Sequence, residues 1–266
     1  MTIREITDAI EQYAPLRLQE EWDNAGIQVG DPEAEVTGVL LCTDATEVVV
    51  AEAIERGFNL VIAHHPLIFR SLKKIMGRTP VERTVAMAIK NDVTIYSAHT
   101  NMDSAWQGVS FRMAQKIGLT NVSFLDSNEV TPYGDNDCPT AGCGVIGDIQ
   151  PMTAREVLKR VKAAFEVGAV RYSGDGDTMV SRVALCGGAG GFLLDKSVEM
   201  GAQLYVTADM RYHDFLDNSQ RIVTADIGHY ESEHFTKEIF LEIIQKKNPT
   251  FAVAFANSET NQVNYL

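Results

Sequence analysis

Residues 59–66, with the sequence Asn-Leu-Val-Ile-Ala-His-His-Pro, constrain the fold more than any other part of this 266-residue chain. The four apolar residues 60–63 are typical of a strand that is buried on both faces, as in a parallel sheet. Pro66 has no backbone donor and therefore ends the strand. His64 and His65 are expected at the carboxyl end of this strand, which is where ligands bind in open α/β sheets.

Expected strands and helices alternate along most of the chain, which predicts βαβ units and an α/β fold with mostly parallel sheets. Thr2 and Glu5 predict a capping box at the start of the first helix, and Thr153 is expected to cap a later one. Residues 127–147 are rich in Asp, Asn, Pro and Gly, so they are expected to form a loop. The expected strands are residues 27–29, 36–43, 60–63, 93–98, 144–149, 169–172, 180–186 and 221–225. The expected helices are residues 3–13, 45–56, 80–91, 110–117, 153–165 and 193–199.

The chain also repeats itself. Residues 39–42 (Val-Leu-Leu-Cys) match residues 183–186 (Val-Ala-Leu-Cys), and the same offset places Leu60 on Leu204. Farther along, a slightly different offset places Ile95 on Ile222. The repeat predicts two similar, duplicated α/β units. We expect them to span residues 1–126 and 127–266, with the C-terminal segment packing back on the first.

Composition limits the classes of function. The net charge of −13, from 36 acidic and 23 basic residues, argues against a general electrostatic attraction to nucleic acid or anionic membrane. The chain contains no apolar run near the ~18 residues that a membrane span needs. Its first residues do not have the charged-then-apolar pattern of a signal peptide. We therefore expect a soluble, cytoplasmic protein.

The four cysteines do not follow a zinc-binding pattern. Cys42 and Cys186 lie in apolar runs and are expected to be buried thiols. Cys138 and Cys143 flank a Pro-Thr-Ala-Gly turn, a spacing that is neither CxxC nor that of a zinc knuckle. A loop disulfide or half of a zinc site stays open for this second pair.

Polar residues with metal-ligand chemistry follow three of the expected strands. The histidine pair follows strand 60–63, and Asp103 comes shortly after strand 93–98. His229 and Glu233 follow strand 221–225, and their i, i+4 spacing places them on one face if the segment is helical. Neutral imidazoles and carboxylates so placed can share a metal. The predicted metal ligands are His64, His65, Asp103, His229 and Glu233.

Three imidazoles and two carboxylates are more ligands than one zinc ion usually takes. They suit two divalent ions ~3.5–4 Å apart, and in such a site a bridging hydroxide is an available nucleophile at neutral pH. No Gly-x-Ser-x-Gly motif and no cysteine with an evident base offers another nucleophile. The identity of the two ions stays open among zinc, iron, manganese, nickel and cobalt.

Some neighbouring residues are candidates for supporting roles. His99, Asp226 and either Thr43 or Asp44 lie at similar strand ends, where a carboxylate or carbonyl could orient a ligating histidine. A solvated loop residue is the alternative for each of them. The glycine-rich residues 187–191 precede an expected helix and could cradle an anion, but a tight turn is the favoured interpretation.

Four blocks of the sequence resemble those of one known family. They are residues 22–30 (Trp-Asp-Asn-Ala-Gly-Ile-Gln-Val-Gly), 64–66 (His-His-Pro), 99–103 (His-Thr-x-x-Asp) and 228–233 (Gly-His-x-x-Ser-Glu). In order and content they resemble the NIF-three-like proteins, also called GTP cyclohydrolase 1 type 2 homologues. The resemblance implies a duplicated α/β fold, a dinuclear metal site in the cleft between the halves, the same five ligands and a ring-like homohexamer.

Two functions follow from these expectations. The first is a metal-dependent hydrolase that acts on a nucleotide or another small phosphorylated molecule, and the family name implies GTP cyclohydrolase activity. The second is a non-catalytic metal-binding protein that regulates or interacts with a partner. A nucleic-acid-binding role ranks below both because of the acidic net charge.

Overall fold

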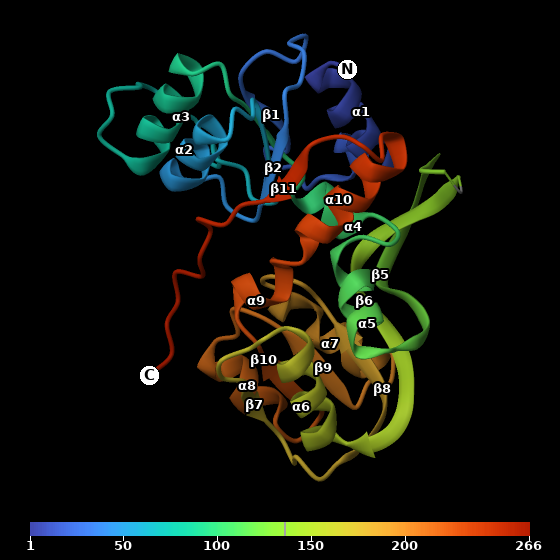
Figure 1. Ribbon diagram of the computed structural model, residues 1–266. Helices are drawn as coiled ribbons and strands as arrows, with labels where there is room; N and C mark the ends of the chain where they lie inside the picture. The colour runs from blue at the N-terminus through green and yellow to red at the C-terminus, as the bar shows by residue number, and fades with distance from the viewer. Residues whose placement is uncertain (136) are drawn as a thin grey trace. The chain divides into compact units, whose positions relative to one another are not determined.

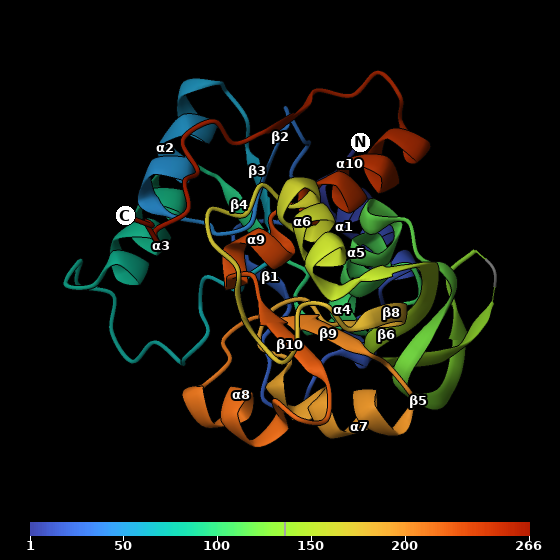
Figure 2. The ribbon, with the colours of Figure 1, turned by 90° about the horizontal axis from the view of Figure 1, so that it is seen from below.

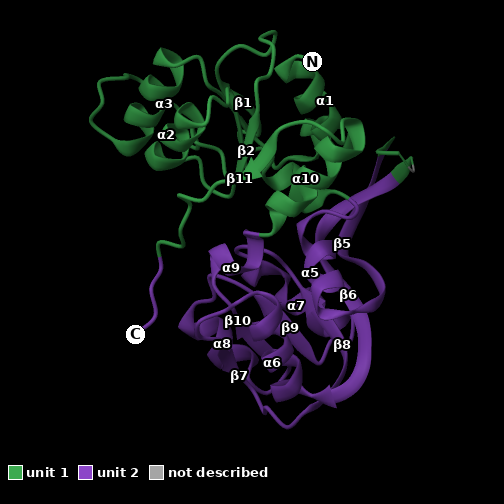
Figure 3. Ribbon diagram, viewed as in Figure 1, with its two compact units in different colours: residues 1–105, 132–138, 235–262 green, residues 106–131, 139–234, 263–266 purple. Residues whose placement is uncertain are grey.

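The structure is a computed structural model that describes residues 1–135 and 137–266 (Figure 1). The chain divides into two compact units (Figure 3). Unit 1 comprises residues 1–105, 132–138 and 235–262. Unit 2 comprises residues 106–131, 139–234 and 263–266. Each unit has its own sheet, and each is described by itself.

Unit 1 is built on a five-stranded sheet with the strand order β1-β4-β3-β2-β11. β2, β3, β4 and β11 run parallel, and β1 pairs antiparallel with β4 at the edge. The strands are β1 (Gly26–Val29), β2 (Val39–Cys42), β3 (Leu60–Ala63), β4 (Thr94–Ser97) and β11 (Val253–Phe255). The helices are α1 (Ile3–Tyr13), η1 (Leu16–Leu18), α2 (Glu47–Glu55), α3 (Pro80–Lys90), α4 (Thr100–Ser104) and α10 (Thr236–Lys247).

Helices cover the sheet of unit 1. α2 and α3 pack against each other and bury Val49, Val50 and Val85 in one apolar cluster with strand residues such as Leu40 and Val61. α10 packs on β2 and on α1, whose capping box holds its first turn. β2, β3 and β4 are fully buried, as the apolar runs in the sequence predict.

Unit 2 is built on a six-stranded sheet with the order β5-β6-β8-β9-β10-β7. β8, β9 and β10 are parallel, whereas β6 pairs antiparallel with β8 and β7 with β10. The strands are β5 (Thr120–Tyr133), β6 (Cys138–Thr153), β7 (Arg171–Ser173), β8 (Met179–Leu185), β9 (Leu204–Thr207) and β10 (Val223–Asp226). The helices are α5 (Val109–Ile117), α6 (Ala154–Ala164), η2 (Gly191–Leu193), α7 (Leu194–Glu199), α8 (Tyr212–Asn218) and α9 (His229–Glu233).

Helices also cover both faces of the sheet in unit 2. In Figure 2, α7 and α8 lie below the central strands of this unit, and α5 and α6 lie above them. The lower layer includes Leu193, Leu194 and Tyr205 in one apolar cluster. α6 begins with the expected cap, because the Thr153 hydroxyl accepts from the Glu156 amide and the Glu156 carboxylate accepts in return.

The expectation of a loop at residues 127–147 is wrong. These residues lie mostly in β5 and β6, which are neighbours in the sheet and are joined by a short turn near Gly134. Position 136, within this segment, lies outside the described residues. Both faces of β5 are largely exposed over residues 126–132, so the strand lacks the apolar alternation by which a half-buried strand is recognised. Gly142 permits the close pairing, because a Cβ there would lie 2.1 Å from the Asp126 carbonyl oxygen.

The protein thus has an α/β fold with two mixed sheets whose central strands are parallel. None of the helices in the described residues has both the length and the apolar character needed to cross a membrane. All four cysteines are free thiols, so Cys138 and Cys143 are not joined by a disulfide.

Candidate metal centre

The histidine pair lies at the carboxyl end of β3. The amides of His64 and His65 continue the ladder to β2, donating to the carbonyls of Cys42 and Thr43 at 3.2 and 2.9 Å. The two rings therefore leave the chain just beyond the strand, and their centroids lie 5.0 Å apart. His64 is fully buried and His65 is half-buried.

Hydrogen bonds fix which nitrogen of each ring can bind a metal. Nδ1 of His64 lies 2.9 Å from the carbonyl oxygen of Ala98, and because a carbonyl only accepts, Nδ1 carries the hydrogen. Nδ1 of His65 lies 2.9 Å from Oδ1 of Asp44 and donates in the same way. In the neutral ring, Nε2 of each histidine is then the unprotonated nitrogen that a divalent metal binds.

Asp103 projects from α4, the single helical turn that follows β4. Its Oδ1 lies 3.8 Å from Nε2 of His64, and its side chain is 24% exposed. An unprotonated imidazole nitrogen and a carboxylate oxygen that face each other have the chemistry of two ligands to one cation. Within unit 1, the structure therefore brings together three of the five predicted ligands.

His229 and Glu233 occupy one face of α9 in unit 2, at the expected i, i+4 spacing. Nε2 of His229 lies 3.1 Å from Oε2 of Glu233, whose side chain is 4% exposed. Nδ1 of His229 donates to Oδ2 of Asp209 at 2.7 Å. Asp209 has a left-handed backbone with φ of 56°, a conformation that aspartate tolerates better than most residues. Such strained residues cluster at functional sites.

The glycine-rich turn after β8 makes room for Glu233. A Cβ at Gly188 would lie 2.3 Å from Oε1 of Glu233 and 3.5 Å from the His229 ring. The amides of Gly187, Gly188 and Gly190 donate to side-chain hydroxyls, which belong to Ser110, Ser232 and Thr207. These amides are engaged within unit 2, so the turn does not present them to an anion as a phosphate-binding loop does.

The supporting residues suggested by the sequence have three different environments. Asp44 bonds His65, as described above. Nδ1 of His99 donates to Asp23, and the His99 ring lies 5.4 and 5.5 Å from the rings of His64 and His65. Asp226 accepts from the amides of Met210 and Gly228, each at 2.9 Å, and from Arg171. Asp226 thus fixes the neighbours of Asp209 and His229 rather than a histidine.

Asp23 is held in its ionised form. Burial by itself raises the pKa of the Asp23 carboxyl, but hydrogen bonds from His99 and Thr100 outweigh this and lower the pKa to about 2. An ionised Asp23 keeps the hydrogen of His99 on Nδ1 at neutral pH, so the neutral ring has an unprotonated Nε2.

Two contributors were not found from the sequence. Asp209 orients His229, although its pairing with a histidine 20 residues away has no sequence signal. Glu259, with a side chain only 3% exposed, accepts from the amides of Thr43 and Asp44 and pairs with Lys237. It therefore anchors the turn that carries Asp44, from a position more than 200 residues away.

A cavity of about 410 Å³ lies in unit 1 beside His65. It is lined by the turn after β2, by Pro66 and Leu67, and by the first turn of α3. Its charged lining residues are Asp44 and Glu47, and Glu47 is paired with Arg83. A cavity with carboxylates in its wall disfavours a phosphate group.

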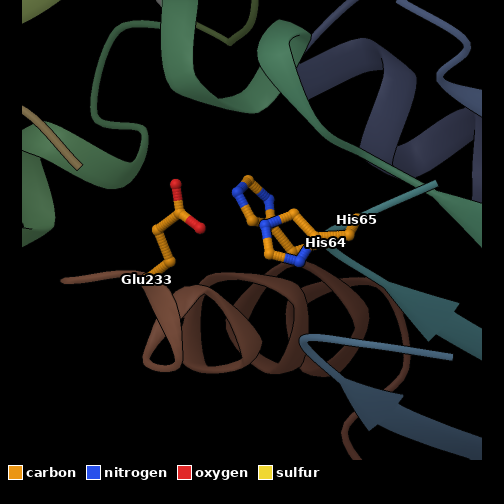
Figure 4. Close-up of side chains that lie close together, drawn as sticks. All are labelled: His64, His65 and Glu233. Atoms are coloured by element: carbon orange, nitrogen blue, oxygen red, sulfur yellow. The ribbon is translucent and has the colours of Figure 1, made fainter. Parts of the chain in front are cut away.

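The described residues that could hold a metal ion include His64, His65 and Glu233 (Figure 4). The two histidines project from the end of β3 and the carboxylate from α9. Imidazole with carboxylate is a ligand chemistry that suits zinc and the neighbouring transition metals. The fold and these side chains define an α/β protein with candidate metal ligands at the ends of its parallel strands.

Comparison with known proteins agrees with this fold and shows the family. Residues 1–262 match the family described as DUF34/NIF3 (NGG1p interacting factor 3), and the chain belongs to this family. The protein named GTP cyclohydrolase 1 type 2 homolog in Clostridium perfringens is 35% identical, over 88% of this chain and 87% of that protein. The protein of the same name in Clostridium acetobutylicum is 33% identical, over 88% and 85% of the two chains.

Solved structures share the fold along the whole chain. A Staphylococcus aureus protein superposes with a TM-score of 0.89 at 26% identity, covering 100% of this chain and 99% of that one. A Bacillus cereus protein related to NIF3 superposes with a TM-score of 0.88 at 25% identity, with the same coverage.

Proposed function

We propose that this chain is a dinuclear metal-dependent hydrolase that acts on a nucleotide or another small phosphorylated substrate. The proposed ligands of the two divalent ions are His64, His65 and Asp103 of unit 1 with His229 and Glu233 of unit 2. The name GTP cyclohydrolase 1 type 2 homolog, borne by two relatives that are 33% and 35% identical, supports a nucleotide as the substrate.

One observation carries the proposal. Each of the three histidines has its Nδ1 hydrogen-bonded to a carbonyl or carboxylate oxygen, which fixes the ring and leaves Nε2 as the ligand atom. An ordinary surface histidine does not need a fixed partner on Nδ1, whereas each of these three histidines has one. Divalent ions bound there would lower the pKa of a coordinated water molecule and polarise a carbonyl or phosphoryl oxygen of the substrate.

The chain's own residues then have defined tasks. Asp44 and Asp209 orient His65 and His229, while Asp226 and Glu259 hold the backbone on which those carboxylates stand. His99, held by Asp23, contributes a further unprotonated Nε2 beside the histidine pair. We propose His99 and Asp226 as supporting residues rather than ligands.

Metal content is the direct test. Protein purified without a histidine tag is expected to contain close to two equivalents of one transition metal per chain by elemental mass spectrometry. Asp103→Ala and Glu233→Ala should each lower that number. Absence of stoichiometric metal after soaking with zinc and manganese would exclude the five-ligand site and the hydrolase with it.

The second candidate is a non-catalytic metal-binding protein that interacts with a partner, which the family description as an interacting factor favours. The two candidates differ in turnover. The hydrolase predicts product from GTP or a related nucleotide that disappears with a chelator and in His64→Ala, while circular dichroism shows an intact fold. Two bound metals without turnover on a broad nucleotide panel would favour the partner-binding protein.

We also propose that the chain assembles into a homohexamer, as its resemblance to the family implies. Sedimentation equilibrium should give six times the chain mass of 29.3 kDa. A monomer at micromolar concentration would contradict this.

A further inference from the structure

Two large aromatic side chains lie exposed beside the histidines of unit 1. Trp22 is 59% exposed and Phe69 is 52% exposed, and their ring centroids are 5.7 Å apart. Both rings also contact His99, at centroid distances of 6.0 and 6.4 Å. Burying an exposed aromatic ring is favourable, so an exposed pair next to a candidate metal centre needs an explanation.

The pair is held in place by polar contacts. The side-chain amide of Asn24 donates to the carbonyl of Ile68 at 2.8 Å, and the Ile68 amide donates to Gln28 at 3.2 Å. These bonds tie the turn that carries Trp22 to the segment that carries Phe69. The adjacent Asp23 is fixed by His99 and Thr100. The two rings therefore form a preorganised surface rather than two independent side chains.

The charge next to this surface is positive, although the protein as a whole is acidic. Four cations follow Phe69 within nine residues, namely Arg70, Lys73, Lys74 and Arg78. The segment 69–80 that contains them is largely exposed. Glu20 and Glu21 precede Trp22 and repel anions, so an anionic group is favoured on the Arg70 side.

We propose that Trp22 and Phe69 form a stacking site for the planar heteroaromatic ring of a nucleotide, whose phosphate is attracted by the basic segment 70–78. An aromatic face binds any base, and a base on an aromatic platform gains contact area at little cost in side-chain freedom. This inference rests on the proposed function, and it places the ring on the His99 side of the histidines. The cavity beside His65, whose charged lining residues are Asp44 and Glu47, is unsuited to phosphate.

The test uses the fluorescence of Trp22. The second tryptophan, Trp106, packs on Phe111 and Phe124 in unit 2, so Trp106→Phe keeps an aromatic ring there and leaves Trp22 as the sole reporter. Guanosine 5′-monophosphate should quench this signal saturably, in a chelator as well as with zinc. Ribose 5-phosphate, which lacks the ring, should not quench it. If Trp106→Phe does not fold, fluorine NMR of the 5-fluorotryptophan-labelled wild type reports on both residues.

Variants separate stacking from charge. Trp22→Ala and Phe69→Ala should each weaken binding of guanosine 5′-monophosphate about tenfold in calorimetry, whereas Trp22→Phe should stay within about twofold. Phe192→Ala removes another exposed aromatic ring, 70% exposed in unit 2, and should change nothing. Neutralising Arg70, Lys73 and Lys74 should weaken the binding of guanosine 5′-monophosphate but leave the binding of guanosine unchanged. Unchanged affinity in Trp22→Ala would overturn the proposal.

Three further outcomes are distinguishable. If the Trp22 signal changes with protein concentration and not with nucleotide, a second copy of the chain covers the pair and the proposal is wrong. If Trp22→Ala keeps its metals and turns over with an unchanged KM, the stacking site fails while the hydrolase stands. If nucleotide quenches Trp22 in a protein that takes up no stoichiometric metal even after soaking with zinc and manganese, the stacking site stands and the proposed function fails.

Discussion

The two units share an arrangement of three parallel strands, β2-β3-β4 in unit 1 and β8-β9-β10 in unit 2, but different side chains follow those strands. In unit 1, Val39 of β2 is paired with Leu60 of β3, and in unit 2, Val183 of β8 is paired with Leu204 of β9. These four residues are related by the offset that the sequence repeat predicts. Yet β3 ends in His64 and His65, whereas β9 ends in Ala208 and Asp209. The same backbone position carries a candidate ligand in unit 1 and the residue that orients a ligand in unit 2.

The third strand shows where the sequence comparison was wrong. Leu60 is paired with Thr94 in unit 1, and Leu204 is paired with Val223 in unit 2. By register, Thr94 is therefore equivalent to Val223. The match of Ile95 with Ile222 instead places Thr94 on Arg221, two residues earlier. The connections before these strands differ in length, and short apolar runs can be matched in more than one way.

The turns after β2 and β8 are also stabilised differently. In unit 1, the turn is anchored from the C-terminal segment by the side chain of Glu259, which pairs with Lys237. In unit 2, the turn is rich in glycine and is anchored by neutral hydroxyls of the same unit. Substitutions at equivalent places in the two units therefore test what each arrangement contributes.

The largest expected difference concerns metal binding at the ends of β3 and β9. His65→Ala removes a proposed ligand and should lower zinc affinity more than about a hundredfold. Asp209→Ala removes only the orienting partner of His229, and such losses are typically about 10- to 100-fold. Competition with a chromophoric chelator measures both, with the exposed His213→Ala as the control. Equal losses in the two variants would contradict the assignment of different roles.

A smaller difference is expected between two glycines of unit 2. Gly188→Ala should destabilise the protein by about 3 kcal/mol, because its Cβ would collide with Glu233 at a positive φ. Gly201 also has a positive φ, but nothing lies within 4 Å of its Cβ position, so Gly201→Ala should cost about 1 kcal/mol. Urea unfolding compares them. Similar losses of unfolding free energy would show that Gly188 is needed only for its positive φ and not for the space beside Glu233.

The two turn anchors should differ next. Glu259→Ala leaves Lys237 partly buried without its carboxylate and should cost about 2 kcal/mol of unfolding free energy in unit 1. Thr207→Val removes a neutral hydroxyl that accepts from Gly190 and should cost about 1 kcal/mol. Denaturant unfolding of the two variants and wild type measures both losses. A smaller loss of unfolding free energy in Glu259→Ala than in Thr207→Val would mean that Glu259 stabilises its turn less than the hydroxyls stabilise theirs.

The smallest effect concerns the pH dependence of the C-terminal segment in unit 1. Burial raises the pKa of the Glu52 carboxyl, but hydrogen bonds from Ser258, Asn257 and Arg56 outweigh it and lower the pKa to about 2. A lowered pKa in the folded state stabilises the protein above the ordinary value near 4.5, and this stability is lost as pH falls from 4.5 to 2.

Wild type should therefore lose about 1 kcal/mol more than Glu52→Gln across this pH window. Thermal unfolding at a series of pH values measures the difference. Glu82, whose pKa is lowered by backbone amides on the exposed surface, provides the comparison variant Glu82→Gln. Parallel pH profiles for wild type and Glu52→Gln would refute the contribution of Glu52.

Much of the fold could be predicted from local pattern. The apolar runs located β2, β3, β4, β8 and β10, and the caps at Thr2 and Thr153 are present as expected. Only the repeat, which places Leu60 on Leu204, pointed to β9. The β5–β6 hairpin was missed because much of β5 is exposed on both faces, so its sequence lacks the alternation of apolar and polar residues that predicts a half-buried strand. The candidate ligands could be selected because each follows the end of a buried strand, a position that sequence order alone defines.

The sequence by itself determined where most of the buried strands form and which candidate metal ligands follow them, since a buried element has a recognisable pattern of apolar residues. Only the tertiary structure decided which residues orient those side chains. Asp44 reaches His65 across 21 residues, and Glu259 reaches Asp44 across 215. A hydrogen-bond partner is chosen by where the folded chain passes, and no local pattern of apolar and polar residues encodes that choice.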